Sequence, residues 1–159
     1  MTTEELMSTT ALKNWKLFLG RLNEKLAPLS DEQLQQQVAP GRNRLLYLIG
    51  HLTAVHDWMF PLLGIGERLH PELNDIYITS PDGAHPDPLS PADLKAAWHE
   101  VNEKLTAAFE KLTPDEWVQK ITTVSDEDFA KDPTRNRLAV FLSRTGHLAF
   151  HSGQAVLVK

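Results

Sequence analysis

A chain of 159 residues, 42% hydrophobic and 23% charged, has the size and balance of one soluble globular domain with a single core. Its net charge of −5 argues against nonspecific nucleic-acid binding, which needs a dense basic surface. No apolar run approaches the roughly 20 residues that span a bilayer, and no basic amphipathic stretch suits an acidic membrane surface. We therefore expect a single domain over residues 1–159, with neither a nucleic-acid nor a membrane partner.

The chain contains no cysteine, and this limits its chemistry. Disulfides, cysteine-ligated metal sites and a cysteine nucleophile are all excluded. Any thiol chemistry would therefore need a thiol supplied from outside the protein. The first ten residues are polar and acidic, unlike a secretory signal, so we expect the protein to be cytoplasmic.

The first half of the chain predicts two long helices separated by a short one. Apolar residues at three- and four-residue spacing predict a helix over residues 4–27, which Pro28 ends. Ser30 and Gln33 have the spacing of a capping box at the start of the short helix. Apolar residues recur at helical spacing over residues 41–60 and predict the second long helix.

The second half begins with a long segment rich in Gly, Pro and Asp, residues 64–90, which is either a functional lid or a crossover. A third long helix, begun by a Ser-Pro pair, is expected over residues 91–112. A short helix is expected to restart at Thr113. An acidic linker, residues 125–132, then leads to a fourth long helix over residues 133–159.

Strand signals are weak along the whole chain, and residues 75–79 (DIYIT) are the one short candidate. The predicted fold class is therefore all-α. Four long amphipathic helices most often close into a four-helix bundle, which is the architecture that we expect.

The two halves of the chain share an order of motifs. EKLAPLSDEQL is followed by RNRL (residues 42–45) and Gly-His-Leu (residues 50–52), and EKLTPDEW by RNRL (residues 135–138) and Gly-His-Leu (residues 146–148). The spacing between RNRL and Gly-His-Leu differs by three residues. Either a degenerate two-fold repeat or chance similarity among amphipathic helices explains this order. A repeat would give the second and fourth helices equivalent places, from which their histidines can converge.

Three histidines on these two helices are the candidate metal ligands. His147 and His151 lie four residues apart, and therefore one turn apart on one face of the fourth helix. His51 lies among leucines in the second helix. Buried imidazoles need polar partners, and one metal ion supplies a partner for all three, although chance or surface placement also explains a lone pair at this spacing. We predict one divalent metal ion bound by His51, His147 and His151.

The donor set indicates which metal would bind and what it could do. Three neutral imidazoles leave positions open on a tetrahedral or octahedral ion, as in catalytic rather than structural sites. An all-nitrogen set suits Zn, Ni, Cu or Fe and disfavours Mg or Ca, and we expect Zn or Ni. An open position can activate water for hydrolysis or bind an external thiol in its reactive thiolate form.

The four other histidines are expected to play smaller parts. His56 lies about 140° around the helix from His51, so it should point elsewhere and belong to the polar face. His70 and His85 lie in the long connecting segment, from which they could reach a substrate. His99 is expected to be an ordinary surface residue.

These motifs together resemble the DinB-like superfamily of metal-binding four-helix bundles, which includes the YfiT-like proteins. Gly-His-Leu at residues 50–52 and the pattern H-x-x-x-H-x-G-Q at residues 147–154 carry the resemblance, which spans nearly the whole chain. It implies an up-down-down-up bundle with a long crossover between the second and third long helices. It also implies a metal centre made by His51, His147 and His151.

The resemblance also suggests an activity. Some members of the superfamily are transferases or isomerases that use low-molecular-weight thiols, and homodimers are frequent. This sequence departs from the common pattern at Arg-Asn-Arg (residues 42–44), where an aromatic residue and Ser or Thr are more usual. It departs again at His-Asp (residues 56–57), where a single acidic residue is often found. Both departures weaken any transfer of the substrate class.

Helical geometry places further polar residues near the histidines, and three of them are our candidate catalytic residues. Tyr47 lies one turn before His51 and could donate a proton, or could be a tyrosine at the edge of the core. Gln154 lies three residues after the last histidine and could hold a substrate or orient that histidine. Arg144 lies three residues before the first histidine of the fourth helix.

The arginines of the two RNR segments sit near helix N-termini, where positive charge opposes the helix dipole. A bound anion would explain this placement. Pairing with the many acidic residues explains it equally simply, and is the interpretation that we favour.

Two classes of function fit the sequence. The first is a metal-dependent enzyme acting on a small molecule, either a transferase that uses a low-molecular-weight thiol or a hydrolase. The second is a non-catalytic, stress-related binding protein. We expect a homodimer in either case.

Overall fold

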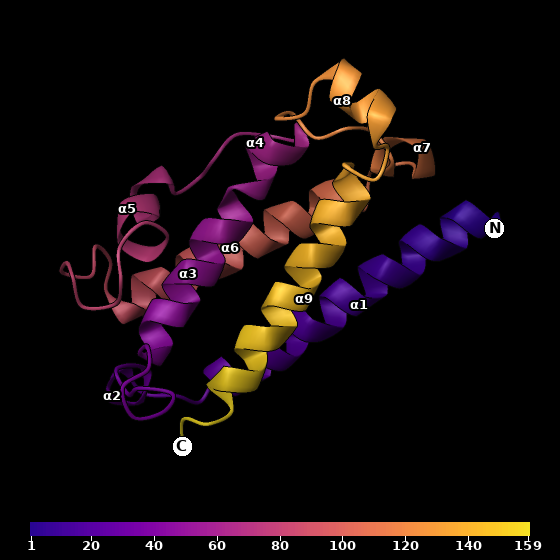
Figure 1. The fold of residues 1–159 in the computed structure, drawn as a ribbon. Helices are drawn as coiled ribbons and strands as arrows, with labels where there is room; N and C mark the ends of the chain where they lie inside the picture. Colours follow the sequence, from indigo (N-terminus) through magenta and orange to yellow (C-terminus); the bar gives the residue numbers. More distant parts are fainter.

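The computed structural model describes residues 1–159, and it is helical, with two isolated β-bridges and no strand (Figure 1). Four helices are long, namely α1 (Thr3–Leu26), α3 (Leu45–Asp57), α6 (Pro91–Phe109) and α9 (Arg137–Ala155). The short ones are α2 (Asp31–Leu34), α4 (Met59–Leu63), the 3₁₀ helix η1 (Pro71–Leu73), α5 (Asn74–Tyr77), α7 (Pro114–Trp117) and α8 (Asp126–Lys131). The predicted all-α fold class is confirmed.

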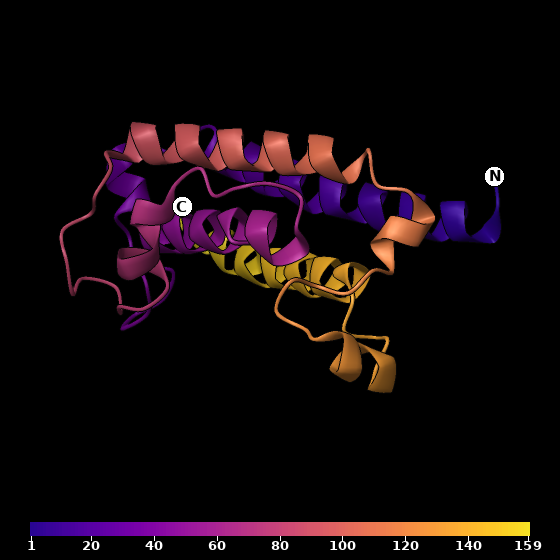
Figure 2. The ribbon, with the colours of Figure 1, turned by 90° about the horizontal axis from the view of Figure 1, so that it is seen from above.

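The four long helices lie side by side and pack in pairs. Helix α3 packs against α6, and α1 packs against α9. In Figure 1, α1 and α9 run in one direction and α3 and α6 in the opposite one. Figure 2 shows α6 and α9 on opposite sides of the molecule, with α8 projecting beyond α9. None of the helices combines the length and apolar character needed to cross a membrane.

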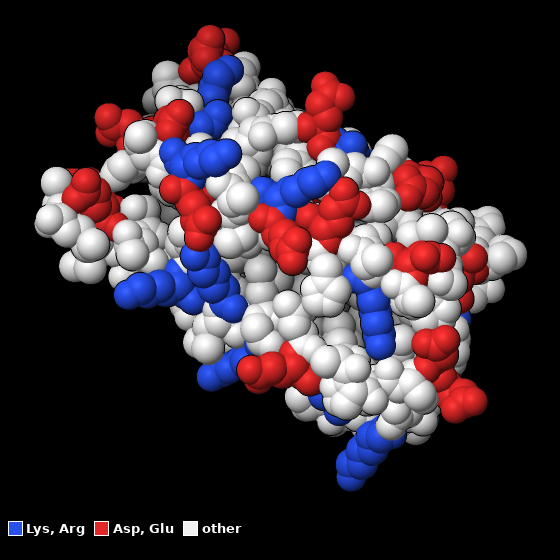
Figure 3. Space-filling view, turned by 180° about the vertical axis from the view of Figure 1, so that it is seen from behind, with Lys and Arg blue, Asp and Glu red and all other residues white.

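Aromatic side chains fill the core between these helices. Trp15, Trp98, Phe109 and Phe141 are all buried. Because a buried indole N–H needs an acceptor, each tryptophan bonds across the interface between α1 and α6. Trp15 donates to the Thr106 hydroxyl at 3.0 Å, while Trp98 donates to an Asn side chain of α1 at 2.7 Å. The surface is mixed in charge, and on the face opposite that of Figure 1, basic and acidic side chains are interspersed (Figure 3).

The short helices begin where the capping signals predict. Ser30 and Gln33 form a capping box at α2, and Thr113 forms the equivalent box with Glu116 at α7. After each short helix the chain makes one antiparallel bridge and then enters a histidine-bearing helix. The bridges are Gln37 with Arg44 before α3, and Lys120 with Asn136 before α9. This shared order favours the two-fold repeat over chance similarity.

Both histidine-bearing helices begin later than expected. Helix α3 starts at Leu45 rather than near Gly41, because Gly41 has φ +71° in a turn that the helix cannot include. Helix α9 starts at Arg137 rather than Pro133, because the Asn136 side chain accepts from the N–H of Ala139 and caps the helix there.

Two other segments differ from their predicted form. The expected acidic linker contains α8, which Ser125 caps by accepting from the N–H of Asp128. In the strand candidate at residues 75–79, residues 75–77 are helical instead and belong to α5, and no strand forms. A lone strand would have no partner for its backbone groups, whereas a helical turn satisfies them internally and still buries Tyr77 against α3. Helix α6 also ends earlier than expected, at Phe109.

The long segment at residues 64–90 is a crossover that returns along α3 to the start of α6, and polar contacts tie it down near both ends. Near its start, the buried Asp57 carboxylate accepts from the backbone N–H groups of Leu69 and His70 and from Arg68. Near its end, the Arg44 guanidinium pairs with two aspartates, at residues 82 and 87. The crossover is therefore held against the whole length of α3.

Candidate metal centre

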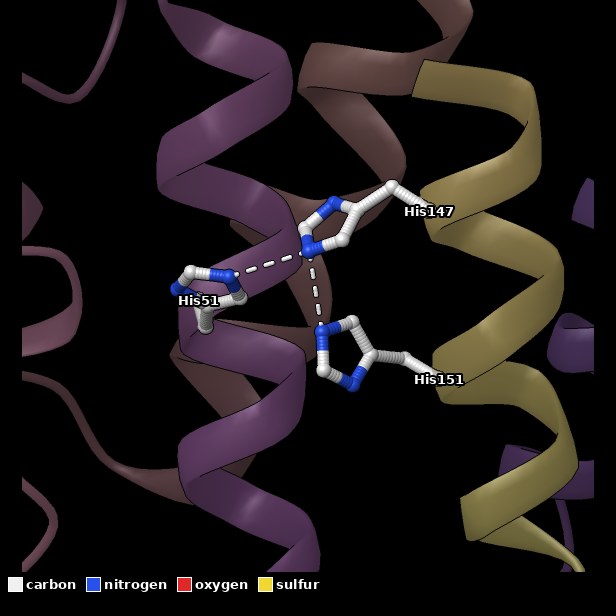
Figure 4. Close-up of side chains that lie close together, drawn as sticks. All are labelled: His51, His147 and His151. Carbon is white, nitrogen blue, oxygen red and sulfur yellow. Dashed lines mark hydrogen bonds between the residues drawn. The ribbon is translucent and has the colours of Figure 1, made fainter. Parts of the chain in front are cut away.

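Three histidine side chains converge between α3 and α9 (Figure 4). The Nε2 atom of His147 lies 3.2 Å from that of His51 and 2.9 Å from that of His151. All three side chains are half-buried. The pair at four-residue spacing in α9 thus faces the single histidine of α3, and the three residues are positioned to hold a metal ion.

The other ring nitrogens of two of these histidines are bound to oxygen atoms. Nδ1 of His51 lies 2.7 Å from the backbone carbonyl oxygen of Tyr77, in the crossover. A carbonyl oxygen can only accept, so this nitrogen carries the proton and Nε2 carries a lone pair. Nδ1 of His151 lies 2.6 Å from the Gln154 amide oxygen, one turn further along the same helix. Nε2 of His151 is therefore also unprotonated and carries a lone pair that a metal ion could bind.

Lone pairs that converge in this way repel one another unless a cation lies among them. If His147 carried its proton on Nε2, this one N–H would have to donate to the Nε2 atoms of both neighbouring histidines, which gives two poor hydrogen bonds. Ligands of one ion with metal–nitrogen bonds of about 2.0–2.1 Å would lie about 3.0 Å apart in octahedral geometry and about 3.4 Å apart in tetrahedral geometry. The two separations that involve His147, 2.9 Å and 3.2 Å, are close to these values, and the ligand atoms of all three histidines lie within 4.8 Å of one another. The residues present therefore fit a divalent transition metal.

The surroundings keep the imidazoles of His147 and His151 neutral. Burial lowers the pKa of His147 to about 4, and the neighbouring histidines and Arg144 act in the same direction. Burial also lowers the pKa of His151. No carboxylate is among the groups that shift either pKa. At neutral pH both rings are therefore available as metal ligands rather than as cations.

The three candidate catalytic residues lie in different settings. The Gln154 oxygen contacts His151, which fits the orienting role considered for it. The Tyr47 ring is parallel to that of His51 at 6.4 Å, but its hydroxyl donates to the Ser80 carbonyl oxygen and so ties down the crossover. Arg144 is half-buried, forms no ion pair, and its Nε atom is buried without a partner.

The expected place of His56 on the polar face is wrong. This side chain is 0% exposed and lies between the rings of Trp15 and Trp98. Helix α3 has no polar face at this level, since α1 and α6 cover the side to which His56 points. The prediction that it points away from His51 agrees with its absence from the converging group.

The remaining histidines lie away from the centre. His70 contacts the carboxylates of Glu72 and Glu100, while His85 and His99 are exposed. A surface hollow of about 630 Å³ lies beside α4 and α6 and is lined by none of the three converging histidines.

In each RNR segment, the arginine next to the helix bonds to another group of the chain. Arg44 pairs with the two aspartates of the crossover, as the pairing interpretation expects, and this raises its pKa. Arg137 donates to the backbone carbonyl of Glu116 instead of to an acidic side chain.

Sequence reasoning missed the carbonyl acceptor of His51. Gly50 makes this contact possible, because a Cβ atom there would lie 2.6 Å from the ring of Tyr77. The absence of a side chain at residue 50 lets the crossover approach α3 and brings the Tyr77 carbonyl to the neighbouring histidine. The glycine next to the histidine was the available signal, but it does not say which distant segment approaches.

Comparison with known families places the chain in one of them. The model of the DinB superfamily matches residues 15–155, which include half of α1 and the whole of the other three long helices. A search of curated proteins finds no match. The family match covers most of the chain and includes the three converging histidines. The chain belongs to the DinB superfamily.

Proposed function

We propose that this protein binds one divalent transition metal through the Nε2 atoms of His51, His147 and His151, and that it is an enzyme transferring a group to or from a low-molecular-weight thiol. The observation that carries the proposal is the convergence of three ring nitrogens, two of which have their tautomer set by an oxygen acceptor. Zn and Ni suit these ligands best.

The chain supplies a binding and orienting framework. Three neutral imidazoles would leave coordination positions open, and a divalent ion there would lower the pKa of a thiol or water molecule that reaches it. The Tyr77 carbonyl and Gln154 hold two of the rings in place. The exposed ring of Phe150, 5.1 Å from that of His151, offers an apolar surface at the edge of the site to a small-molecule substrate.

Thiol transfer is favoured over hydrolysis by what surrounds the histidines. Metal-dependent hydrolases commonly use a carboxylate beside the metal as a general base. The converging group contains only histidines, and no carboxylate shifts the pKa of His147 or His151. A thiol that brings its own nucleophilic sulfur needs no such base once its proton is lost. The cysteine-free chain would obtain this thiol from solution.

The finer architecture and setting belong to the same proposal. We infer an up-down-down-up four-helix bundle, supported by the helix directions in Figure 1 and by the crossover between α3 and α6. A homodimer is supported by exposed apolar side chains on α9 and just beyond its end, where Leu142, Val156 and Leu157 are each more than half exposed. A cytoplasmic location stays a prediction from the sequence.

The first experiment measures metal in protein purified without a histidine tag. We expect close to one Zn or Ni per chain, and a loss of that metal in the double variant His147→Ala/His151→Ala. The matched control is His85→Ala/His99→Ala, which removes two exposed histidines away from the site. Substoichiometric metal in equal amounts in the wild type, the double variant and the control would contradict the proposed metal site.

The second experiment tests the reaction on metal-loaded protein. A panel of low-molecular-weight thiols is combined with an electrophilic acceptor, and product is measured with and without each thiol. We expect turnover that requires both the thiol and the three histidines. Turnover without a thiol would favour the hydrolase, and stoichiometric metal without any turnover would favour a non-catalytic binding protein.

A further inference from the structure

The three converging histidines differ in how their second nitrogens are satisfied. Nδ1 of His51 and Nδ1 of His151 each have an oxygen acceptor, whereas Nδ1 of His147 is buried and has no partner in the protein. A metal-ligating histidine nearly always donates its other N–H to an acceptor, which fixes the ring and its tautomer. His147 therefore needs an acceptor that neither the crossover nor its own helix supplies.

His56 offers such an acceptor, and it is the most deeply buried histidine of the chain. Its Nδ1 lies 2.7 Å from the side-chain oxygen of Asn102, while the amide nitrogen of Asn102 donates to the carbonyl of Trp98. Nδ1 of His56 is consequently the protonated nitrogen, and Nε2 bears a lone pair. This Nε2 is buried and has no donor. Burial lowers the pKa of His56 to about 3, so the lone pair persists at neutral pH.

Besides His147 and His56, Arg144 also has a buried side-chain nitrogen without a hydrogen-bond partner. Its Nε–H is buried without an acceptor. Positive charge on His147, on Arg144 or on His51 would lower the pKa of His56. Helices α3 and α9 run in opposite directions (Figure 1), and His51 contacts His147, so the turn after His51 and the turn before His147 lie at the same level. In Figure 4, Nδ1 of His147 lies on the side of its ring that faces away from His51 and His151.

We propose that His56 positions His147 through one buried water molecule. The water would accept hydrogen bonds from Nδ1–H of His147 and Nε–H of Arg144, and would donate one to Nε2 of His56. Two donors and one acceptor match the capacity of a water molecule, and about three hydrogen bonds are usual for a buried water. The chain from Asn102 through His56 to the water then keeps the proton of His147 on Nδ1. Its Nε2 lone pair faces the metal, so this role rests on the proposed function.

Metal affinity tests the positioning role. His56→Phe keeps a ring between the two tryptophans but removes the acceptor, and we expect Zn or Ni to bind 10–100-fold more weakly in a competition titration. His56→Gln, whose amide oxygen can accept a hydrogen bond, should recover part of the affinity. The matched control is Thr145→Val, a buried change of similar shape on α9, which should bind metal within two-fold of the wild type. Unchanged affinity in His56→Phe would overturn the positioning role.

A high-resolution crystal structure of the metal-free wild-type protein tests the water independently of metal binding and of any variant's stability. We expect an ordered water molecule within hydrogen-bonding distance of His56 Nε2, His147 Nδ1 and Arg144 Nε. Density showing no water, or a direct contact of His56 with another group, would overturn the link. If the wild-type protein bound no metal while the water was present, the proposed function would fail and the buried link would stand.

Discussion

Helices α3 and α9 each bring histidines to the same centre, yet they are buried to different degrees. Of the 13 residues of α3, 12 are buried, because α6 covers one side and the crossover another. Helix α9 has 19 residues, of which four are buried. The histidine of α3 is accordingly oriented by a distant backbone carbonyl, whereas His151 is oriented by a glutamine of its own helix. Changes on the site-facing side of α3 should therefore affect stability and the site together, whereas in α9 the two effects should be separable.

The largest effect is expected at Asp57, where α3 holds the start of the crossover. Its buried carboxylate accepts two backbone N–H groups and pairs with Arg68 at 3.0 Å. Asp57→Ala leaves these donors and the charge unpaired, and should lower the free energy of unfolding by about 3–5 kcal/mol. Urea denaturation measures the change. Glu127→Ala, which removes an exposed partner of Lys131, should cost less than about 0.5 kcal/mol. Equal effects would contradict the importance of the buried anchor.

The next effect is the loss of stability in acid that His56 causes. Its pKa is about 3 in the folded protein, below the ordinary value of 6.5, so between these values the unfolded chain binds a proton that the folded chain does not. The contribution of His56 to the free energy of unfolding is fully present above pH 6.5. It falls by about 1.4 kcal/mol per pH unit as the pH drops towards 3. The lowered pKa of His147 acts in the same direction. Denaturation series from pH 7 to 4 should show a shallower slope for His56→Phe than for the wild type.

Two glycines that precede histidines, one in α3 and one in α9, provide the sharpest test of the difference between these helices. Gly50→Ala places a Cβ atom 2.6 Å from the ring of Tyr77, whereas nothing lies within 4 Å of a Cβ at Gly146. We expect the first change to cost about 1–3 kcal/mol and to weaken metal binding, because the Tyr77 carbonyl must move away from His51. The second should stabilise its helix by up to about 1 kcal/mol and leave metal affinity unchanged. Similar changes in stability and metal affinity in both variants would contradict the proposed difference between α3 and α9.

The smallest effect on stability is expected at Gln154. Gln154→Leu removes the acceptor of the His151 Nδ1 proton on a half-buried side chain, so the free energy of unfolding should change by less than about 0.5 kcal/mol. Metal affinity should nevertheless fall 10–100-fold, because the ring loses its fixed orientation. Unfolding curves and a metal competition titration on the same samples separate the two effects. A loss of stability without a loss of affinity would contradict the orienting role.

Local signals in the sequence account for the features that were predicted well. The four-residue spacing of His147 and His151 places both on one face of any helix, whatever packs against it. Ser30 and Thr113 act within three residues of themselves, so their capping boxes needed no knowledge of the tertiary structure. The all-α fold class likewise follows from helical periodicity in each long segment.

Contacts between distant segments account for what was missed. The rotation from His51 to His56 gave the right direction, but it could not show that α1 and α6 cover that side of α3. Residues 75–79 offered only a weak strand signal, and residues 75–77 pack as a helical turn against α3, where Gly50 leaves room for the ring of Tyr77. The carbonyl of Tyr77 carries no side-chain signal at all, and only the path of the crossover brings it to His51.

In the proposed metal centre, that carbonyl would make the docking of the crossover a condition for binding metal. A histidine without an acceptor at Nδ1 divides its population between two tautomers, and only one of them presents Nε2 to the site. The apparent affinity for metal is then the intrinsic affinity reduced by the fraction of molecules that are ready to bind. Arg44, which holds the far end of the crossover through two aspartates, would in this sense be a remote determinant of metal occupancy. The amount of metal bound at a limiting concentration would report how firmly this connecting segment is closed.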